Sequence, residues 1–252
     1  MFRQDISLGS PWMNAAGTLG FSPSGSASAR WTAPEPMGAF VTNPISLGPR
    51  TPAAERCLLP FSGGVLMHSG LPNPGLTRVL RKYGDRWAQS SLPVWAHLIG
   101  ANPDEIHQMV RRLEGVEGVS AVELGLPPDA RGDAALAYVE AAFGELPLVV
   151  HLPLTMAGEP WLKELAGLGT SALTLGAPRG ALLTDTGRPV NGRLFGPATF
   201  PLMLAAVQSA RRLGIPVIAG AGIYRLHDVE ALRNAGAWAV QLDTVLWRGW
   251  AA

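Results

Sequence analysis

Residues 215–226 read IPVIAGAGIYRL, an apolar run followed by a glycine-rich turn and by the start of a helical pattern near Leu226. This order is typical of a βα unit, whose turn presents backbone N–H groups at the positive end of the helix. Many α/β proteins hold a phosphate there. The stretch therefore indicates a parallel sheet and a candidate phosphate site at Gly220, Ala221 and Gly222, with an ordinary tight turn as the alternative.

The sequence contains eight short apolar or β-rich segments, this one included, separated by helical patterns. Buried parallel strands read as nearly continuous apolar runs because helices cover one face of the sheet and the barrel interior covers the other. Eight such strands in a chain of 252 residues favour a single α/β domain over residues 1–252, a (β/α)8 TIM barrel. The segments are 12–17, 38–43, 93–99, 120–126, 147–153, 171–177, 216–222 and 238–244.

Several helix signals agree with this architecture. Residues 102–116 begin with Asn102 or Asp104 as the capping residue, and residues 197–214 and 225–236 each end on a glycine. Two connections are long, about 44–92 after the second strand and about 177–197 after the sixth. Since the loops that follow strands build the active face of such barrels, these insertions are the expected substrate-side structures.

Composition narrows the class of partner. The formal net charge is +1 without a basic block, which argues against nucleic acid and against an anionic membrane, and favours a small-molecule substrate. Cys57 is the only cysteine, so the chain forms no internal disulfide, and a reducing, cytoplasmic setting is expected. No apolar run reaches the length of a membrane span, and we expect a soluble, unprocessed protein. The five histidines lack metal-site spacing.

Six motifs occur in the order of the dihydroorotate dehydrogenase family, particularly its soluble class, and the chain resembles that family from about Ser10 to Trp247. This resemblance implies an FMN-dependent oxidoreductase of pyrimidine biosynthesis, in which a base removes a proton while hydride passes to the flavin. It also leaves open a homo-oligomer or an electron-transfer partner subunit. The motifs are SPWMNAAGTLGF, GAFVTNPISLGPR, HSGLPNPGL, GRLFGPAT, IPVIAGAGI and AVQLDT.

The resemblance assigns roles to particular residues. Asn73 and Met67 fall in the loop that meets the substrate, and residues 14–17 match a strand that runs beneath the flavin. The glycine-rich turn after the seventh strand corresponds to a flavin-phosphate loop, with a second phosphate turn after the eighth. The residues implied in cofactor binding are Ala15, Ala16, Gly17, Gly196, Gly220, Ala221, Gly222, Asp243 and Thr244.

The chain departs from the family at catalytic positions. Asn43 and His151 stand where the family has lysines, and they are the catalytic candidates here. His151 can donate a hydrogen bond, or a positive charge if protonated, to a reduced flavin; a core histidine is the alternative. Gly125 replaces an asparagine, and the loop after it lacks the serine or cysteine that acts as the base.

Asp243 is a further departure, because the family has glycine near the phosphate and a carboxylate there repels a dianion. Arg193 is a candidate partner for that carboxylate or for the phosphate, with a rim salt bridge as the alternative. Three interpretations therefore remain: a dihydroorotate dehydrogenase-like oxidoreductase, a degenerate barrel acting as a binding or partner subunit, and a phosphate-binding barrel of another activity.

Overall fold

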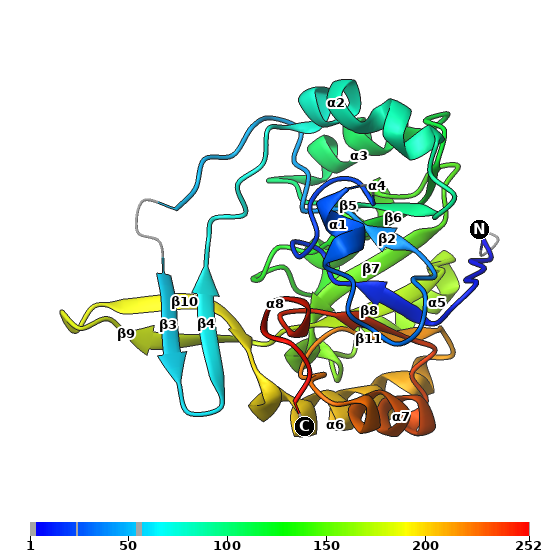
Figure 1. Cartoon of the computed structure of the whole chain (residues 1–252). Coiled ribbons are helices and arrows are strands. Elements are labelled where there is room, and N and C mark those ends of the chain that lie inside the picture. Colours follow the sequence, from blue (N-terminus) through cyan, green and yellow to red (C-terminus); the bar gives the residue numbers. More distant parts are fainter. Residues whose placement is uncertain (1–3, 24, 54–56, 252) are drawn as a thin grey trace.

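A computed structural model describes residues 4–23, 25–53 and 57–251. Eight parallel strands form one sheet in the order β1-β12-β11-β8-β7-β6-β5-β2. A parallel bridge between Met13 and Ala39 joins the two outer strands, so the sheet closes into a barrel (Figure 1). The strands are β1 Trp12–Asn14, β2 Phe40–Val41, β5 Val94–Leu98, β6 Val119–Gly125, β7 Leu148–Pro153, β8 Ala172–Gly176, β11 Val217–Ala219 and β12 Ala239–Leu242. Each lies within a segment predicted from the sequence or extends one residue beyond it, and the TIM barrel is confirmed.

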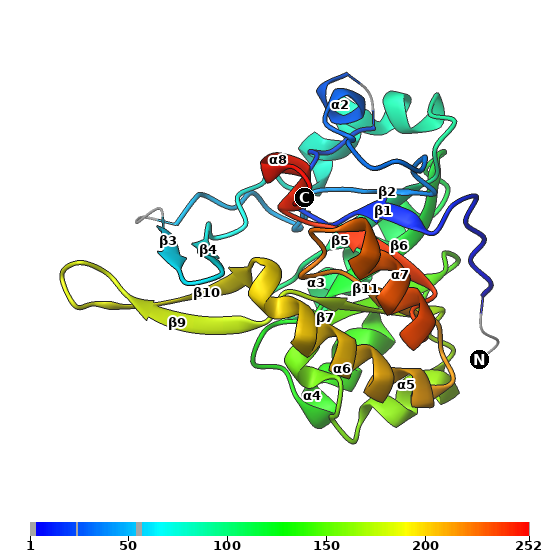
Figure 2. The same ribbon diagram turned by 60° about the horizontal axis from the view of Figure 1, so that its bottom comes forward.

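The helices form a layer outside the barrel (Figure 2). Asn102 caps α3 as predicted, because its side chain accepts a hydrogen bond from the N–H of Glu105 at 2.9 Å. The glycines that end the two later helical patterns, Gly214 and Gly236, have left-handed backbone with φ of 73° and 114°. The helices are α1 Ser26–Ala29, α2 Leu76–Ala88, α3 Pro103–Leu113, α4 Gly132–Ala141, α5 Leu162–Leu168, α6 Phe200–Ala210, α7 Leu226–Ala235 and α8 Val245–Arg248.

Two apolar layers hold the barrel together. The larger lies between the strands and the helices, and it includes Phe40, Leu98 and Ile106, all fully buried. The smaller fills the lower interior of the barrel, where Trp95 is the largest side chain. Its other buried members are Met13, Ala39, Val41, Ala121, Val149, Ala172, Ile218 and Ala239. Since alternate residues of a strand point to opposite faces, this layer also fixes which residues line the interior above it.

The two long insertions contain strands that the sequence did not lead us to predict. Their four strands, β3 Cys57–Phe61, β4 Gly64–His68, β9 Arg179–Leu183 and β10 Pro189–Phe195, pair in the order β3-β4-β10-β9. All pairs are antiparallel, and this sheet extends away from the barrel in Figure 1. The two hairpins pack Leu66 of β4 against Val190 of β10, and each hairpin is stabilised by pairing with the other.

Asn14 completes the seam where the barrel closes. β2 is only two residues long, so the backbone ladder at this point is short. The side chain of Asn14 donates to the carbonyl of Val41 at 2.7 Å and accepts from the N–H of Val41 at 2.9 Å. Asn14 is fully buried, and its amide thus replaces two ladder hydrogen bonds.

We predict that Asn14→Ala lowers the free energy of unfolding by about 3 kcal/mol, because it leaves a buried N–H and a buried carbonyl of Val41 without partners. Urea denaturation followed by circular dichroism measures the change. Asn191→Ala, on the exposed face of β10, is the matched control and should change stability by less than about 0.5 kcal/mol. Equal effects of the two substitutions would contradict this role for Asn14.

Candidate functional site

A layer of polar side chains lies in the barrel directly above the inner apolar layer. Each comes two residues after an apolar member of that layer on the same strand, and therefore points the same way. Four of the five are fully or almost fully buried, and His151 is half-buried. The five are His97 on β5, Glu123 on β6, His151 on β7, Thr174 on β8 and Gln241 on β12.

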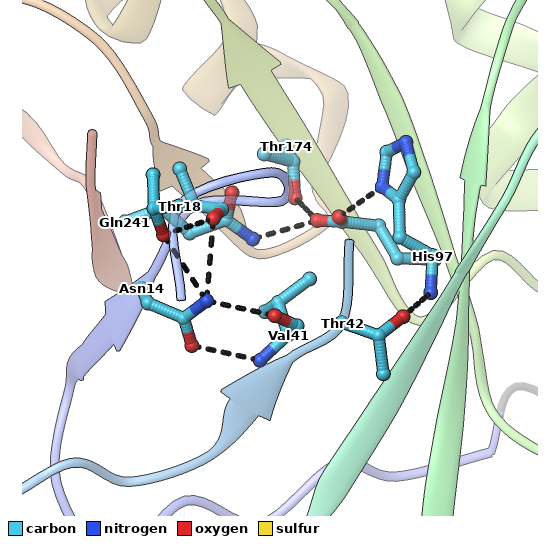
Figure 3. A network of polar contacts seen from close by, with 9 residues as sticks. Asn14, Thr18, Val41, Thr42, His97, Thr174 and Gln241 are labelled. Carbon is cyan, nitrogen blue, oxygen red and sulfur yellow. Dashed lines mark hydrogen bonds and ion pairs between the residues drawn. The ribbon is translucent and has the colours of Figure 1, made fainter. Parts of the chain in front are cut away.

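Glu123 is the centre of this layer. One carboxylate oxygen lies 2.6 Å from Nδ1 of His97, and the other accepts hydrogen bonds from Thr174 Oγ1 at 2.8 Å and from Gln241 Nε2 at 2.6 Å. The N–H of His97 in turn donates to the hydroxyl of Thr42 at 3.0 Å. Figure 3 shows these contacts converging on one carboxylate inside the barrel. A buried charge is therefore satisfied by groups from three other strands.

The surroundings set the charge of these groups. Burial alone would raise the pKa of Glu123, but the hydrogen bond from His97, the charges of both histidines and the Thr174 hydroxyl lower it to about 2. Burial lowers the pKa of His151 to about 3, although the charge of Glu123 acts in the opposite direction. His151 is therefore neutral near pH 7 and can donate one hydrogen bond. The lowered pKa does not support the positive charge considered from the sequence.

Two glycines make room for the two histidines. A Cβ atom at Gly125 would lie 2.7 Å from Nε2 of His97, and one at Gly176 would lie 2.3 Å from Nε2 of His151. The imidazole rings themselves are in edge contact, with centroids 5.2 Å apart. His97 therefore occupies space that the side chain of a residue larger than glycine at position 125 would need. Its buried Nε2 has no hydrogen-bond partner among the described residues.

Two neighbouring cavities follow the carboxyl ends of the strands. The larger, about 280 Å³, lies over β1 and β12 and is covered by the four-stranded antiparallel sheet. The smaller, about 170 Å³, lies over β5, β6, β7 and β8. Both are lined by Arg50, Leu71, Pro128, Arg179 and Arg193, so the two cavities share a wall. The insertions thus cover the face where TIM barrels place their active sites.

Asp243 occupies the corner of the larger cavity that follows β12. Its Oδ1 accepts a hydrogen bond from Thr244 Oγ1 at 3.3 Å, while its buried Oδ2 has no hydrogen-bond partner among the described residues. Burial raises the pKa of Asp243 to about 7, although the N–H and hydroxyl of Thr244 and the N–H groups of Val245 and Gly222 face the carboxylate and act in the opposite direction. The carboxyl group therefore lies among backbone N–H groups of the turns after β11 and β12.

The larger cavity brings together many of the residues expected from the resemblance. Residues 15–17 form one wall, with Asp243 and Thr244 beside them and Met67 opposite. His151 lines the smaller cavity instead. No ion pair joins Arg193 to Asp243 within the described residues, and the rim salt bridge considered from the sequence is absent from them.

The other candidates make structural contacts and do not line either cavity. Asn43 accepts from the N–H of Gly20 at 3.1 Å. Asn73 accepts from Ser46 and from the N–H of Gly75, and its backbone pairs with that of Arg50. Gly196 packs against Gly63, where a Cβ would lie 2.2 Å from the carbonyl oxygen. Gly220, Ala221 and Gly222 are buried, and a Cβ at Gly222 would lie 2.6 Å from the backbone N of Phe200. Ligand contact by these residues stays a prediction.

Sequence reasoning missed Glu123, Thr174 and Gln241. A signal was present, since each stands two residues after a small apolar residue of its strand, as in AVE, ALT and AVQ. Aligning the strands by this spacing would have placed all three in one interior layer.

Two further findings concern other kinds of site. Within the described parts of the chain, no three histidine, cysteine, aspartate or glutamate side chains lie close enough to share a metal ion. In the same parts, none of the helices combines the length and the apolar character that crossing a bilayer requires.

Comparison with known proteins gives a consistent set of relatives, although no protein-family model matches the chain. Proteins named dihydroorotate dehydrogenase B (NAD(+)), catalytic subunit, from Trichlorobacter lovleyi and Desulforudis audaxviator are 30% and 29% identical over 259 residues. These matches cover 95% of the chain and 84% and 83% of the relatives. A putative dihydroorotate dehydrogenase A (fumarate) from Pediococcus pentosaceus is 27% identical, with 95% and 85% coverage.

A solved structure has the same fold. It is the crystal structure of DHODH from Eimeria tenella in complex with ferulenol, with a TM-score of 0.74 at 15% identity, covering 95% of this chain and 77% of that one. At this identity the similarity bears on the fold alone, and it agrees with the closed barrel described above.

We predict that Asp243→Asn stabilises the protein at alkaline pH. The folded-state pKa of Asp243, about 7, exceeds its ordinary value of 3.8, so its contribution to stability is complete below about pH 4 and is lost as the pH rises through 7. By thermal denaturation, the variant should therefore unfold several degrees above the wild type at pH 8.5 and by a clearly smaller margin at pH 5. Asp185→Asn, at an exposed turn, should track the wild type at both values. A constant difference at the two pH values would contradict the buried, protonated carboxyl.

Proposed function

The chain belongs to the dihydroorotate dehydrogenase family, and we propose that it is a dihydroorotate dehydrogenase-like oxidoreductase that transfers hydride from a small cyclic substrate to FMN. The observation that carries the proposal is the larger cavity at the carboxyl end of the barrel, whose wall is the small-residue segment 15–17. The family's pathway, pyrimidine biosynthesis, comes with the proposal. Two relatives are named catalytic subunits, which supports a partner subunit as part of it.

The wall formed by residues 15–17 suits a flat ring. Ala15, Ala16 and Gly17 carry at most a methyl group, so a planar ligand can approach the backbone closely. Phe195 and Leu71, on the insertion side, supply apolar cover and exclude water from the cavity. When bound, a flavin supplies an acceptor for two electrons and a proton at this wall. The chain itself supplies position, polarity and shielding.

The corner at Asp243 suits a phosphate only under one condition. An ionised carboxylate there repels a dianion, whereas the protonated carboxyl can donate a hydrogen bond to a phosphate oxygen. Tyr224, whose hydroxyl contacts Thr244, adds no negative charge of its own, since burial raises its pKa to about 12. The residues present therefore fit FMN when Asp243 carries a proton.

The polar layer supplies the remaining groups. Neutral His151 can donate a hydrogen bond from one ring nitrogen into the smaller cavity, while Glu123 holds His97 in place behind it. The loop after β6 contributes Leu126, Pro127 and Pro128, which cannot take a proton from a substrate. This last feature favours the second candidate, a barrel that binds its ligand without turnover. A reducing, cytoplasmic setting remains part of the proposal because the chain has one cysteine.

We predict that the purified protein retains FMN after incubation and desalting at pH 6, with the visible absorption of bound flavin. Anaerobic addition of dihydroorotate, or of a related cyclic amide, should bleach this band if the oxidoreductase proposal holds. Retained flavin that no such compound bleaches would favour the binding-subunit alternative. Protein without retained flavin at pH 6 would overturn both flavin proposals.

We also predict that FMN affinity depends on the protonation of Asp243. Between pH 6 and pH 8 the ratio of FMN affinity to riboflavin affinity should fall by about tenfold, because the pKa of Asp243, about 7, lies between these values. Fluorescence titration with both flavins measures the ratio, and riboflavin controls for effects on the ring. In Asp243→Asn the ratio should change much less. An equal fall of the ratio in this variant would assign the pH dependence to ionisation of the FMN phosphate or of another residue.

A further inference from the structure

Three arginines from separate segments meet at the wall shared by the two cavities. Arg50 precedes β3, Arg179 begins β9 and Arg193 lies within β10, and each lines both cavities. Arg179 and Arg193 are direct partners in the antiparallel ladder of β9 and β10. Partners of this kind have Cβ atoms about 5 Å apart on the same face of the sheet. Two guanidinium groups are thus held side by side at one cavity wall.

This arrangement brings like charges together at one wall, with Arg193 half-buried and with Arg50 and Arg179 reaching solvent. Like charges directly opposite each other destabilise a strand pair. Burial lowers the pKa of Arg193, and the charge of Arg179 lowers it further. None of the three arginines forms an ion pair within residues 4–23, 25–53 and 57–251. Glu123, the acid whose charge acts on Arg193, is already bonded to three other side chains.

Hydrogen bonds of its side chain and backbone position Arg50 at this wall. Its Nε donates to the carbonyl of Gly70 at 3.3 Å, and its backbone forms a two-way bridge with Asn73, with N–O distances of 2.9 and 3.1 Å. Asn73 is itself fixed by hydrogen bonds from Ser46 and Gly75. The buried Asn73 thus positions an arginine at the cavity, and its own contact with the substrate stays a prediction.

We propose that Arg50, Arg179 and Arg193 form a binding site for a compact ligand with at least two negative charges, a dicarboxylate or a phosphate monoester. A guanidinium group matches the paired oxygens of either anion with two parallel hydrogen bonds. Apolar groups between the arginines, Leu71 and Pro128, would cover the uncharged part of the ligand. Resting on the proposed function, this ligand is the substrate, which carries more negative charge than the single carboxylate of dihydroorotate.

Thermal unfolding of the flavin-free protein tests the site, with succinate and inorganic phosphate as probes and sodium chloride at equal ionic strength as the salt control. The wild type should be stabilised by at least one probe beyond the effect of chloride. In Arg193→Gln and in Arg179→Gln the affinity for that probe should fall by about tenfold or more. Arg212→Gln, an exposed arginine that lines neither cavity, should bind like the wild type.

The same variants provide a second readout without any ligand. Because a like-charge pair is removed, neither Arg193→Gln nor Arg179→Gln should lower the unfolding temperature of the probe-free protein. Stabilisation by phosphate alone identifies a phosphorylated substrate. Stabilisation by succinate alone identifies a dicarboxylate substrate. Equal stabilisation by chloride, or unchanged probe affinity in both variants, would overturn the proposal. Flavin titration of the same samples separates this proposal from the proposed function. Loss of probe binding with flavin binding retained would contradict the anion site alone. Loss of flavin binding with probe binding retained would contradict the flavin proposal alone.

Discussion

The interior of the barrel depends on one buried carboxylate. Glu123 joins β6 to β5, β8 and β12 through three short hydrogen bonds, and it lies directly above the apolar layer that contains Trp95. Removing one partner of a buried, bonded charge typically costs about 3–5 kcal/mol. The contacts of Glu123 also fix the ring of His97 and, through it, the edge contact with His151. The floor of the smaller cavity therefore takes its shape from this single group.

The two histidines of the polar layer are coupled in space to two glycines. The ring of His97 on β5 lies where a side chain at position 125 of β6 would begin. The ring of His151 on β7 lies over Gly176 of β8 in the same way. Each glycine thus accompanies a histidine on the neighbouring strand. Because burial lowers the pKa of His151 to about 3, this ring suits hydrogen bonding better than a fixed positive charge.

Charge is also distributed differently along the two cavities. Asp243, with its pKa raised to about 7, lies after β12, while Arg179 and Arg193 lie side by side in the antiparallel sheet that covers the cavities. Under the proposed function, a ligand that spans this face would meet Asp243 at one end and the arginines at the other. The insertions would then determine substrate choice together with the barrel.

The sequence was sufficient to predict the barrel because each strand is a compact apolar run with a helix signal behind it. The family resemblance also placed Ala15, Ala16, Gly17 and Asp243 at one site, and these residues line the same cavity. The hairpins of the insertions were missed because their stability comes from pairing between segments more than 100 residues apart, as for Leu66 and Leu194. The Glu123 layer was missed because its register across strands is a tertiary property.

A crystal structure of the protein grown with FMN at pH 6 would locate the flavin. We expect the isoalloxazine ring against Ala15, Ala16 and Gly17, with the phosphate beside Asp243 and the turn at Gly222. A flavin bound elsewhere on the molecule, or a ring in the larger cavity with its phosphate directed away from Asp243, would contradict this expectation.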